Sequence, residues 1–230
     1  MKHSIIIPTL NEEENISKLL DFFAKFALPT SEIIVVDGGS HDKTIELIKR
    51  FKNVQLIQTE KASRALQLNA GAKAASGGIY YFVHADVLPP STFEKDIDAT
   101  LQSGGQIGCY RFTFDKNALM LKFNAWWTRF DFMFCRGGDQ TLFVTKQVFE
   151  DLNGFDEHYI IMEDFDLIRR ARKRFKFKII PKDVIVSARK YKLNSYFKVN
   201  MVNLYSYWCF MFGKSPEKIR DNYKKWLVFD

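Results

Sequence analysis

Three acidic positions, far apart in the chain, have the residue types and settings that chemistry on a phosphorylated ligand requires. Asp37 and Asp86 each follow a short apolar run that predicts a buried strand, and Glu163-Asp164 opens a basic helical pattern. A carboxylate at a strand end can hold Mg²⁺ or Mn²⁺ against a diphosphate, which makes Asp86 the candidate metal ligand. Adjacent carboxylates at a helix start lie at the favourable end of the helix dipole and can supply a general base.

Each of these residues also has a structural interpretation that the sequence leaves open. Asp86 could cap the turn before two prolines, and Asp37 could begin a glycine-rich turn rather than hydrogen-bond a base or a ribose. Glu163 and Asp164 could form an ordinary acidic first turn of a helix. For Asp37, the position at the end of a strand favours ligand contact.

Basic and amide side chains could complete the site. Arg64 lies before a helix among small residues that would let a phosphate or base approach closely, although most single arginines are solvated. Asn69 falls on or near the same helix and could equally be a packing residue. Arg189 belongs to the basic cluster Arg189-Lys190-Tyr191.

Strands alternate with helices in the first half of the chain. Segments with helical spacing follow each of four apolar runs, at 5–8, 32–36, 54–57 and 79–86. This alternation predicts a parallel sheet with right-handed crossovers, whose strand ends deliver polar groups into one crevice. Asn11 followed by Glu14 predicts an N-cap for the first helix. Separate strands are predicted near 178–180 and 184–187.

Two aromatic stretches at helical spacing, 119–133 and 197–212, mark the second half, and each carries Lys or Arg beside the rings. The favoured interpretation is that these stripes pack on the sheet and on each other. The functional interpretation is a membrane-facing surface that meets a lipid-linked or hydrophobic acceptor. Four rings would then lie at the headgroup level: Trp126, Trp127, Tyr207 and Trp208.

Length and composition indicate a globular protein of one large domain or two small ones, and the absence of a repeat or flexible linker favours one domain. The net charge of +7 and the pI near 9.2 favour nucleic acid, an anionic membrane face or a phosphorylated small molecule, without choosing among them. Three distant cysteines predict neither a disulfide framework nor a zinc site, and favour a reduced, cytoplasmic setting. We expect no signal peptide and no spanning helix, hence a soluble or peripheral protein.

Missing motifs argue against several enzyme classes. The four histidines lack the spacing of a zinc hydrolase. No Gly-x-Gly-x-x-Gly follows the first strand and no P-loop is present, which disfavours doubly wound dehydrogenases and P-loop NTPases.

Four motifs in series resemble the inverting family-2 glycosyltransferases of GT-A fold, and their order and spacing cover most of the chain. They are Ile6-Ile7-Pro8-Thr9-Leu10-Asn11-Glu12-Glu13, Val35-Val36-Asp37-Gly38-Gly39-Ser40 with Asp42, Val83-His84-Ala85-Asp86, and Glu163-Asp164-Phe165-Asp166-Leu167. Five further segments resemble a small bacterial subgroup often labelled radical-SAM-associated or arsenosugar-biosynthesis-type transferases. They lie at 64–71, 84–86, 138–140, 187–189 and 213–217.

The resemblance implies an α/β protein of GT-A fold, with a Rossmann-like, mostly parallel sheet flanked by helices and aromatic helices in the C-terminal half. It implies one glycosyltransferase domain, 1–230, with a nucleotide-sugar half at 1–108 and an acceptor half at 109–230. The activity implied is a hexosyltransferase-type transfer from a UDP- or GDP-linked sugar. The acceptor stays open, with a lipid-linked or hydrophobic molecule as one candidate.

The resemblance also implies roles for residues. Asp86 would hold Mg²⁺ or Mn²⁺ on the diphosphate, and Asp164 would take the proton from the acceptor hydroxyl as it attacks the anomeric carbon with inversion. The implied substrate-binding residues are Pro8, Thr9, Leu10, Asn11, Glu12, Asp37, Gly38, Arg64, Asn69, His84, Asp86, Glu163 and Arg189. These assignments require that Asp37, Asp86 and Asp164 converge in a single pocket.

Two departures from the family pattern refine the expectation. The usual metal motif has Asp two positions before the ligand, where this chain has His84, whose imidazole could bind a ribose or the metal. The Gln-x-x-Arg-Trp motif of processive members is absent, so we expect one sugar per event.

Two alternatives are kept. A nucleotidyltransferase would need a basic, glycine-rich first loop, whereas 8–14 is acidic. A non-catalytic basic binder of membrane or nucleic acid would lack carboxylates at the strand ends. We expect no nucleic acid partner, and a cytoplasmic protein that could lie at the inner face of the membrane.

Overall fold

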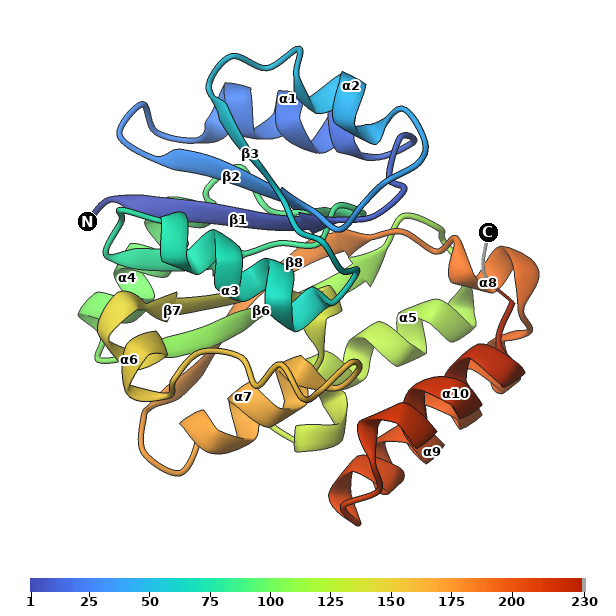
Figure 1. The fold of residues 1–230 in the computed structure, drawn as a ribbon. Coiled ribbons are helices and arrows are strands. Elements are labelled where there is room, and N and C mark those ends of the chain that lie inside the picture. The colour runs from blue at the N-terminus through green and yellow to red at the C-terminus, as the bar shows by residue number, and fades with distance from the viewer. Residues whose placement is uncertain (229–230) are drawn as a thin grey trace.

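The structure is a computed structural model that describes residues 1–228 (Figure 1). Strands in this range form one eight-stranded sheet in the order β3-β2-β1-β4-β7-β6-β8-β5. Their bounds are β1 (His3–Thr9), β2 (Glu32–Asp37), β3 (Val54–Gln58), β4 (Ile79–Phe82), β5 (Val87–Leu88), β6 (Ile107–Phe114), β7 (Leu142–Thr145) and β8 (Phe177–Val186). The predicted α/β class with a mostly parallel sheet is confirmed.

The first four strands run parallel to one another, as the alternation of strands and helices predicted. β7 reverses direction and lies antiparallel between β4 and β6. The two strands predicted near 178–180 and 184–187 are one strand, β8, which pairs with β6 across a bulge between Tyr110 and Arg111. The bulge keeps both parts of β8 in the same ladder.

Helices cover both faces of the sheet. They are α1 (Ile16–Phe26), α2 (Thr44–Ile48), α3 (Arg64–Ala74), α4 (Phe93–Gln102), α5 (Leu119–Trp126), α6 (Lys146–Asp151), α7 (Glu163–Ala171), α8 (Lys190–Leu193), α9 (Tyr196–Met211) and α10 (Pro216–Trp226). Short 3₁₀ turns are η1 (Trp127–Arg129), η2 (Met133–Cys135) and η3 (Gly138–Gln140). Figure 1 shows α1 and α2 over one face, and α3, α6 and α7 over the other.

Side chains of the parallel strands alternate between two apolar cores. Ile5 and Ile7 of β1 pack in a core with α1 and α4, whereas Ile6 packs in the opposite core with α3 and α7. Because both faces of the sheet are covered, these strands need apolar residues at every position. The two cores therefore explain why the run Ile5-Ile6-Ile7 is unbroken.

The fourth strand is shorter than predicted. β4 ends at Phe82, and the chain then turns, with the Val87 N–H donating to the His84 carbonyl. The chain must leave the ladder here because β5 pairs with β8 at the far end of the sheet. His84 and Asp86 therefore lie in a connection and not on a strand.

The predicted N-cap at Asn11 is wrong. α1 begins at Ile16, with Asn15 in the N-cap position. Asn11 instead has φ of 53°, and its Oδ1 accepts a hydrogen bond from the His41 N–H at 2.9 Å. This bond to the neighbouring loop draws the side chain away from the helix start.

The aromatic stretch 119–133 is helical only in its first part. α5 ends at Trp126, and η1 follows. Buried Arg136 accounts for the break, because its Nη2 donates to the carbonyls of Thr128 and Phe130 at 2.8 and 2.6 Å. Both carbonyls accept hydrogen bonds from Arg136 instead of from backbone N–H groups of a longer helix.

The favoured packing of the aromatic stripes is confirmed in part, because α5 contacts β6 and the ring centroids of Phe134 and Tyr207 lie 6.4 Å apart, but several large rings remain exposed. Phe123 is 59% exposed, Trp126 44%, Phe197 69% and Trp208 51%. In Figure 1, α5, α9 and α10 lie to one side of the sheet, with α9 packed along α10. These helices use their other faces for packing and leave large rings in solvent.

Candidate functional site

The carboxyl ends of β1, β2 and β4 bring three predicted ligand-binding segments to one edge of the sheet. Thr9 lies beside Asp37 in the pairing of β1 with β2, and β4 flanks β1 on its other side. Gln67 of α3 ties two of these ends together, because its Nε2 donates to backbone carbonyls of β1 and β2 at 2.8 and 2.7 Å. The edge is therefore held rigidly before any ligand binds.

The first segment turns outward at Leu10. Pro8 and Thr9 are buried in β1, whereas Leu10 is 42% exposed. The Asn11 N–H donates to Ser40 Oγ at 2.9 Å, which joins this loop to the one after β2. Glu12, next in the chain, reaches toward β8.

Asp37 lies at the same edge, but its carboxylate is fully buried and bonded within the protein. It accepts hydrogen bonds from the N–H groups of Gly39 and Ser40 at 2.9 Å each. Gly38 lies against Gln67, and a Cβ on Gly38 would lie 3.1 Å from that side chain. In this structure Asp37 shapes the turn that follows β2.

A cluster of opposite charges lies where the β1 and β4 connections meet the end of β8. Arg189 donates from Nη1 to Glu12 Oε2 at 3.0 Å, and its Nη2 lies 3.5 Å from Asp86 Oδ2. Burial, and next the charge of Asp139, raise the pKa of Asp86 to about 6, although Arg189 acts in the opposite direction. The predicted metal ligand is therefore close to a fixed positive charge.

The acid pair at the start of α7 is buried. Glu163 is 1% and Asp164 7% exposed. Met162, with φ of 73°, turns the chain into the helix, and Arg64 of α3 donates from Nη1 to Glu163 Oε1 at 3.0 Å. Burial, and next the Glu163 charge, raise the pKa of Asp164, and Arg64 only partly offsets this. A carboxylate with a raised pKa accepts a proton more effectively near neutral pH.

Gly138 brings His84 and Asp164 to the same short piece of backbone. A Cβ on Gly138 would lie 2.2 Å from His84 Cε1 and 2.4 Å from Asp164 Oδ2, so no side chain fits there. The Gly138 N–H also hydrogen-bonds the Asp164 carboxylate. Burial, and next the charge of Arg64, lower the pKa of His84, so its imidazole is neutral.

Asp139 is a site residue that the sequence patterns did not single out. Its half-exposed carboxylate has Oδ1 4.0 Å from His84 Nδ1. Its charge raises the pKa of both Asp86 and Asp164, the predicted metal ligand and the predicted base. Its signal in the sequence was the segment 138–140 of the subgroup resemblance, which gave Asp139 no role.

Lys190 is the second such residue. Its Nζ donates to Tyr223 Oη of α10 at 3.0 Å. Burial alone would lower the pKa of Lys190, but the interactions with Tyr223 and Asp139 outweigh it and raise the pKa. Lys190 therefore stays charged beside the site, where it also acts on His84.

The predicted residues thus divide into two groups. Asp86 and Asp164 share Arg64 and Asp139 as charged neighbours, so the structure brings the candidate metal ligand and base together. Asn69 is used elsewhere, because its Nδ2 donates to the Phe155 carbonyl at 2.9 Å and its Oδ1 accepts from the Phe155 N–H at 3.0 Å. Like buried Asp37, it supports a loop beside the site.

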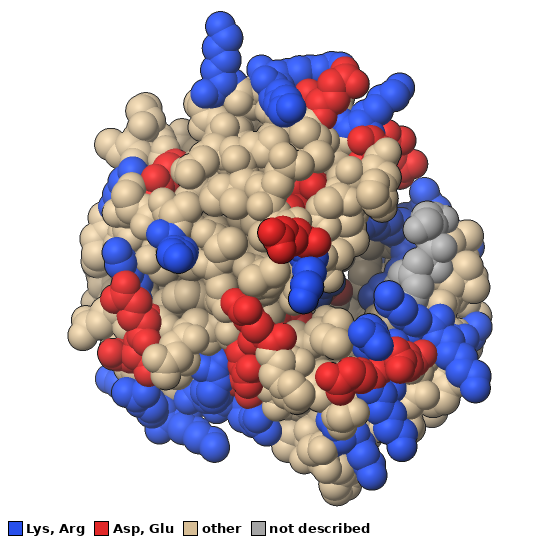
Figure 2. Space-filling view, viewed as in Figure 1, with Lys and Arg blue, Asp and Glu red and all other residues tan. Residues whose placement is uncertain are grey.

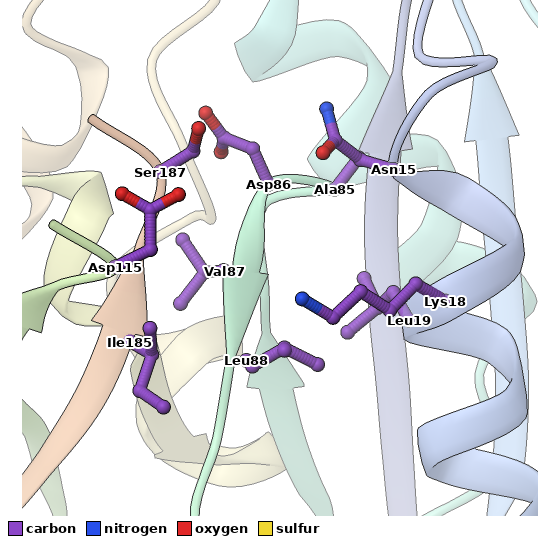
Figure 3. Close-up of a pocket in the computed structure, with 10 residues that line it drawn as sticks. All are labelled: Asn15, Lys18, Leu19, Ala85, Asp86, Val87, Leu88, Asp115, Ile185 and Ser187. Atoms are coloured by element: carbon purple, nitrogen blue, oxygen red, sulfur yellow. The ribbon is translucent and has the colours of Figure 1, made fainter. Parts of the chain in front are cut away.

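A small cavity of about 50 Å³ adjoins Asp86 between α1, β5 and β8. Figure 3 shows Lys18 reaching toward it from α1, and Asp86, Ser187 and Asp115 at its other end. The Ala188 N–H holds Asp115 Oδ1 at 2.9 Å. The volume admits water-sized groups, so a larger ligand must bind in the open edge above it.

The residues fit a metal that is shared with a ligand and not a metal held by protein alone. Among residues 1–228, no three or more His, Cys, Asp or Glu side chains are grouped to hold a metal ion. Mg²⁺ and Mn²⁺ commonly take one or two carboxylates and complete their shells with substrate phosphates. Asp86, whose Oδ2 lies 3.5 Å from Arg189 Nη2, could supply one such carboxylate.

Comparison with known proteins places the chain among transferases. The family model described as glycosyl transferase family 2 matches residues 4–145. Glycosyltransferase AglE of Haloferax volcanii is 30% identical over 183 residues, which are 73% of this chain and 60% of that protein. The Methanococcus voltae dolichyl N-acetyl-alpha-D-glucosaminyl phosphate 3-beta-D-2,3-diacetamido-2,3-dideoxy-beta-D-glucuronosyltransferase is 36% identical over 107 residues, 43% of this chain and 33% of that protein. The chain thus spans about a third to three fifths of their lengths.

Solved structures share the fold. S. aureus TarS 1-349 in complex with UDP-GlcNAc superposes with a TM-score of 0.67 at 20% identity, covering 82% of this chain and 59% of that one. Mannosyltransferase PcManGT from Pyrobaculum calidifontis, in complex with GDP-Man and Mn²⁺, superposes with a TM-score of 0.69 at 17% identity, covering 96% and 67%. The expected GT-A architecture is confirmed.

Proposed function

Because the chain belongs to glycosyl transferase family 2, we propose that it moves one sugar from a nucleotide-diphosphate sugar to an acceptor hydroxyl, with inversion at the anomeric carbon. The observation that carries this proposal is the buried carboxylate of Asp164, whose pKa is raised, across the Gly138 backbone from His84 and near Asp86. A base of this kind beside a candidate diphosphate site is what direct displacement at a sugar requires.

The donor would bind along the carboxyl edge of the sheet. Leu10 to Glu12 and the turn after β2 would surround the nucleoside, and the neutral His84 imidazole would offer a hydrogen bond to the ribose. Solved relatives in complex with UDP-GlcNAc and with GDP-Man support a UDP- or GDP-linked donor. The sugar that is transferred would be a hexose.

Proton transfer falls to Asp164. The acceptor oxygen forms a bond to the anomeric carbon on the face opposite the diphosphate, and its proton passes to the Asp164 carboxylate. The bond from that carbon to the diphosphate oxygen breaks, and the electron pair leaves with the diphosphate. Arg64 and Glu163 hold Asp164 in place and set its pKa. General-base assistance of this kind contributes about 10²- to 10⁴-fold in rate.

Positive charge for the leaving diphosphate would come from Arg189 and Lys190. Both precede or begin α8, and Arg189 already lies beside Asp86. A Mg²⁺ or Mn²⁺ ion on Asp86 would neutralise charge that develops on the diphosphate. Binding of a donor requires Arg189 to share Asp86 with that ion or to turn toward the phosphates.

The acceptor side is proposed more broadly. We place the protein in the cytoplasm, with a lipid-linked or hydrophobic acceptor at the inner face of a membrane. Within residues 1–228, no helix is both long enough and apolar enough to cross a bilayer. Membership of the radical-SAM-associated or arsenosugar-biosynthesis-type subgroup is proposed from the five short segments alone. The division of the domain into a donor half, 1–108, and an acceptor half, 109–230, is part of the same proposal.

Nucleotide titrations test the proposal. We expect UDP or GDP, and the matching sugar conjugates, to bind with a dependence on Mn²⁺ that Asp86→Asn removes. Slow hydrolysis of the preferred sugar conjugate would then identify the donor. Binding of nucleoside triphosphate with release of pyrophosphate would instead indicate a nucleotidyltransferase. Absence of nucleotide binding with and without metal would refute the proposal.

A further inference from the structure

α9 exposes an apolar stripe along its whole length. Its buried face consists of Val199, Val202, Ser206 and Phe210 at helical spacing. The opposite face carries large apolar side chains that are between 38% and 74% exposed and continue just past the helix end: Phe197, Met201, Leu204, Tyr205, Trp208, Met211 and Phe212. A soluble surface helix normally turns such residues inward. α9 is therefore mainly apolar on both faces, although one of them is open to water.

A second apolar cluster lies on the segment 119–134. Its exposed members are Leu119, Met120, Phe123, Trp126, Phe132 and Phe134. Ring contacts join this cluster to the stripe on α9, because Phe134 lies 6.4 Å from Tyr207, which lies 5.8 Å from Trp208. The two clusters therefore form one surface, which we call the aromatic surface. Contiguous exposed apolar surfaces of this kind mark binding sites for proteins or membranes.

Positive charge flanks the α9 part of the aromatic surface. Between residues 191 and 228 the sequence has seven Lys and Arg against two acidic residues. Figure 2 shows Lys and Arg gathered along the edge formed by α8 and α10. Lys198 stands within the stripe, and Lys214 and Lys218 follow it, all three exposed. Anionic lipid headgroups complement a surface with apolar rings at the centre and lysines at its margin.

We propose that the aromatic surface docks on an anionic lipid bilayer. A second copy of the chain fits less well, because two copies joined through this surface would bring their lysine margins together. All four tryptophans of the chain, Trp126, Trp127, Trp208 and Trp226, belong to α5, η1, α9 or α10. Tryptophan is suited to the headgroup level because its ring is apolar and its N–H is polar.

Docking in this way would place the candidate site beside the membrane. Phe165, next to Asp164 in α7, packs 5.8 Å from the Tyr207 ring of α9. At the other side, Lys190 donates to Tyr223 of α10. α9, which carries the stripe, and α10, which packs along it, thus both contact residues of the site, which suits an acceptor carried in the bilayer. Only this last step rests on the proposed transferase function.

Sedimentation with vesicles tests the docking without substrate. We expect binding to vesicles of phosphatidylcholine with phosphatidylglycerol at low salt, weakening as salt rises and with phosphatidylcholine alone. Phe197→Ser with Met201→Ser should weaken binding about tenfold or more, because two largely exposed apolar side chains are lost from the contact. Tryptophan emission of the parent protein should shift to shorter wavelength with these vesicles.

Matched controls use equivalent residues elsewhere. Phe26→Ser with Leu28→Ser removes two exposed apolar side chains near the end of α1 and should leave vesicle binding unchanged. Lys214→Gln with Lys218→Gln should lower binding to the anionic vesicles by roughly 10- to 30-fold, at about 1 kcal/mol for each lysine. The same change at Lys49 and Lys52, both exposed, should have no effect.

Three outcomes would overturn the proposal. One is no sedimentation with anionic vesicles at low salt. Another is equal loss of binding in the control at residues 26 and 28. The third is a dimer in light scattering that the Phe197→Ser and Met201→Ser changes abolish while vesicles do not bind, which would assign the surface to a second copy. Donor titration is independent, so failure of docking and failure of the transferase proposal are distinguishable.

Discussion

Replacing Asp164 with Asn should stabilise the fold while it abolishes sugar transfer. The Asp164 side chain is 7% exposed and lies beside Glu163, so its negative charge is unfavourable in the folded protein. Burial and Glu163 raise its pKa from 3.8 to about 8. A group with a raised pKa in the native state must take up a proton to fold at neutral pH, and that uptake costs free energy.

The size of the effect follows from the pKa change. Each pKa unit corresponds to about 1.4 kcal/mol, so at pH 7, where the unfolded carboxyl group is ionised, the raised pKa of Asp164 lowers the stability of the fold by a few kcal/mol. Asparagine has the same shape and no charge, and should recover roughly 2 to 4 kcal/mol. Because the unfolded pKa lies near 4, the gain should be absent below that pH and grow as pH rises toward neutrality. Loss of the base should lower kcat by about 10²- to 10⁴-fold.

Asp166→Asn provides a matched control on the same helix. Asp166 is also buried, but its carboxylate pairs with Arg169 at 2.9 Å and Arg170 at 2.6 Å. Its replacement should therefore destabilise the fold, by about 1 to 3 kcal/mol because the two arginines are partly exposed. Urea unfolding from pH 4 to 8, with donor binding and kcat, measures both variants. A lower unfolding free energy for Asp164→Asn at pH 7, or retained transfer, would refute the assignment of Asp164 as the strained base.

Further predictions concern the neighbours of Asp164. Glu163→Gln should move the rising limb of the pH profile of kcat/KM to lower pH, since one negative charge that raises the Asp164 pKa is removed; an unchanged profile would contradict this. Gly138→Ala should abolish transfer and lower the melting temperature, because the new Cβ would lie 2.2 Å from His84 Cε1; activity near that of the parent protein would show that the loop is free to move. Lys190→Met should weaken UDP or GDP binding about 10- to 100-fold in calorimetry, through loss of a charge-assisted hydrogen bond to phosphate, whereas Lys192→Met at an exposed position should not.

Much of the fold could be read from local patterns. The unbroken runs such as Ile5-Ile6-Ile7 predicted strands buried on both faces, and the helical spacing between runs predicted their parallel pairing. Local patterns failed where a distant partner decided the backbone. Arg136 ends α5 by taking carbonyls of Thr128 and Phe130, and no periodicity in 119–133 signals that contact.

The same division holds for the site. Asp86 and Asp164 could be selected from the sequence because residue type and position at an element end are local properties. Asp139 and Lys190 could not, because their role depends on the charges that folding places around them. Asp37 was selected from the sequence for ligand contact because it lies at a strand end. In the structure its carboxylate instead accepts hydrogen bonds from the N–H groups of Gly39 and Ser40 in the turn after β2.

The sequence by itself determined the family, the order of the strands along the chain, and the acidic side chains that the chemistry needs, because these follow from residue types and their spacing. Tertiary structure alone decided which charges meet and which apolar faces remain open. The pKa of Asp164 depends on the burial that the fold imposes, and the exposure of α9 depends on which of its faces finds a packing partner. Both are properties of contacts between segments distant in the chain, and such contacts leave no periodic signal in either segment.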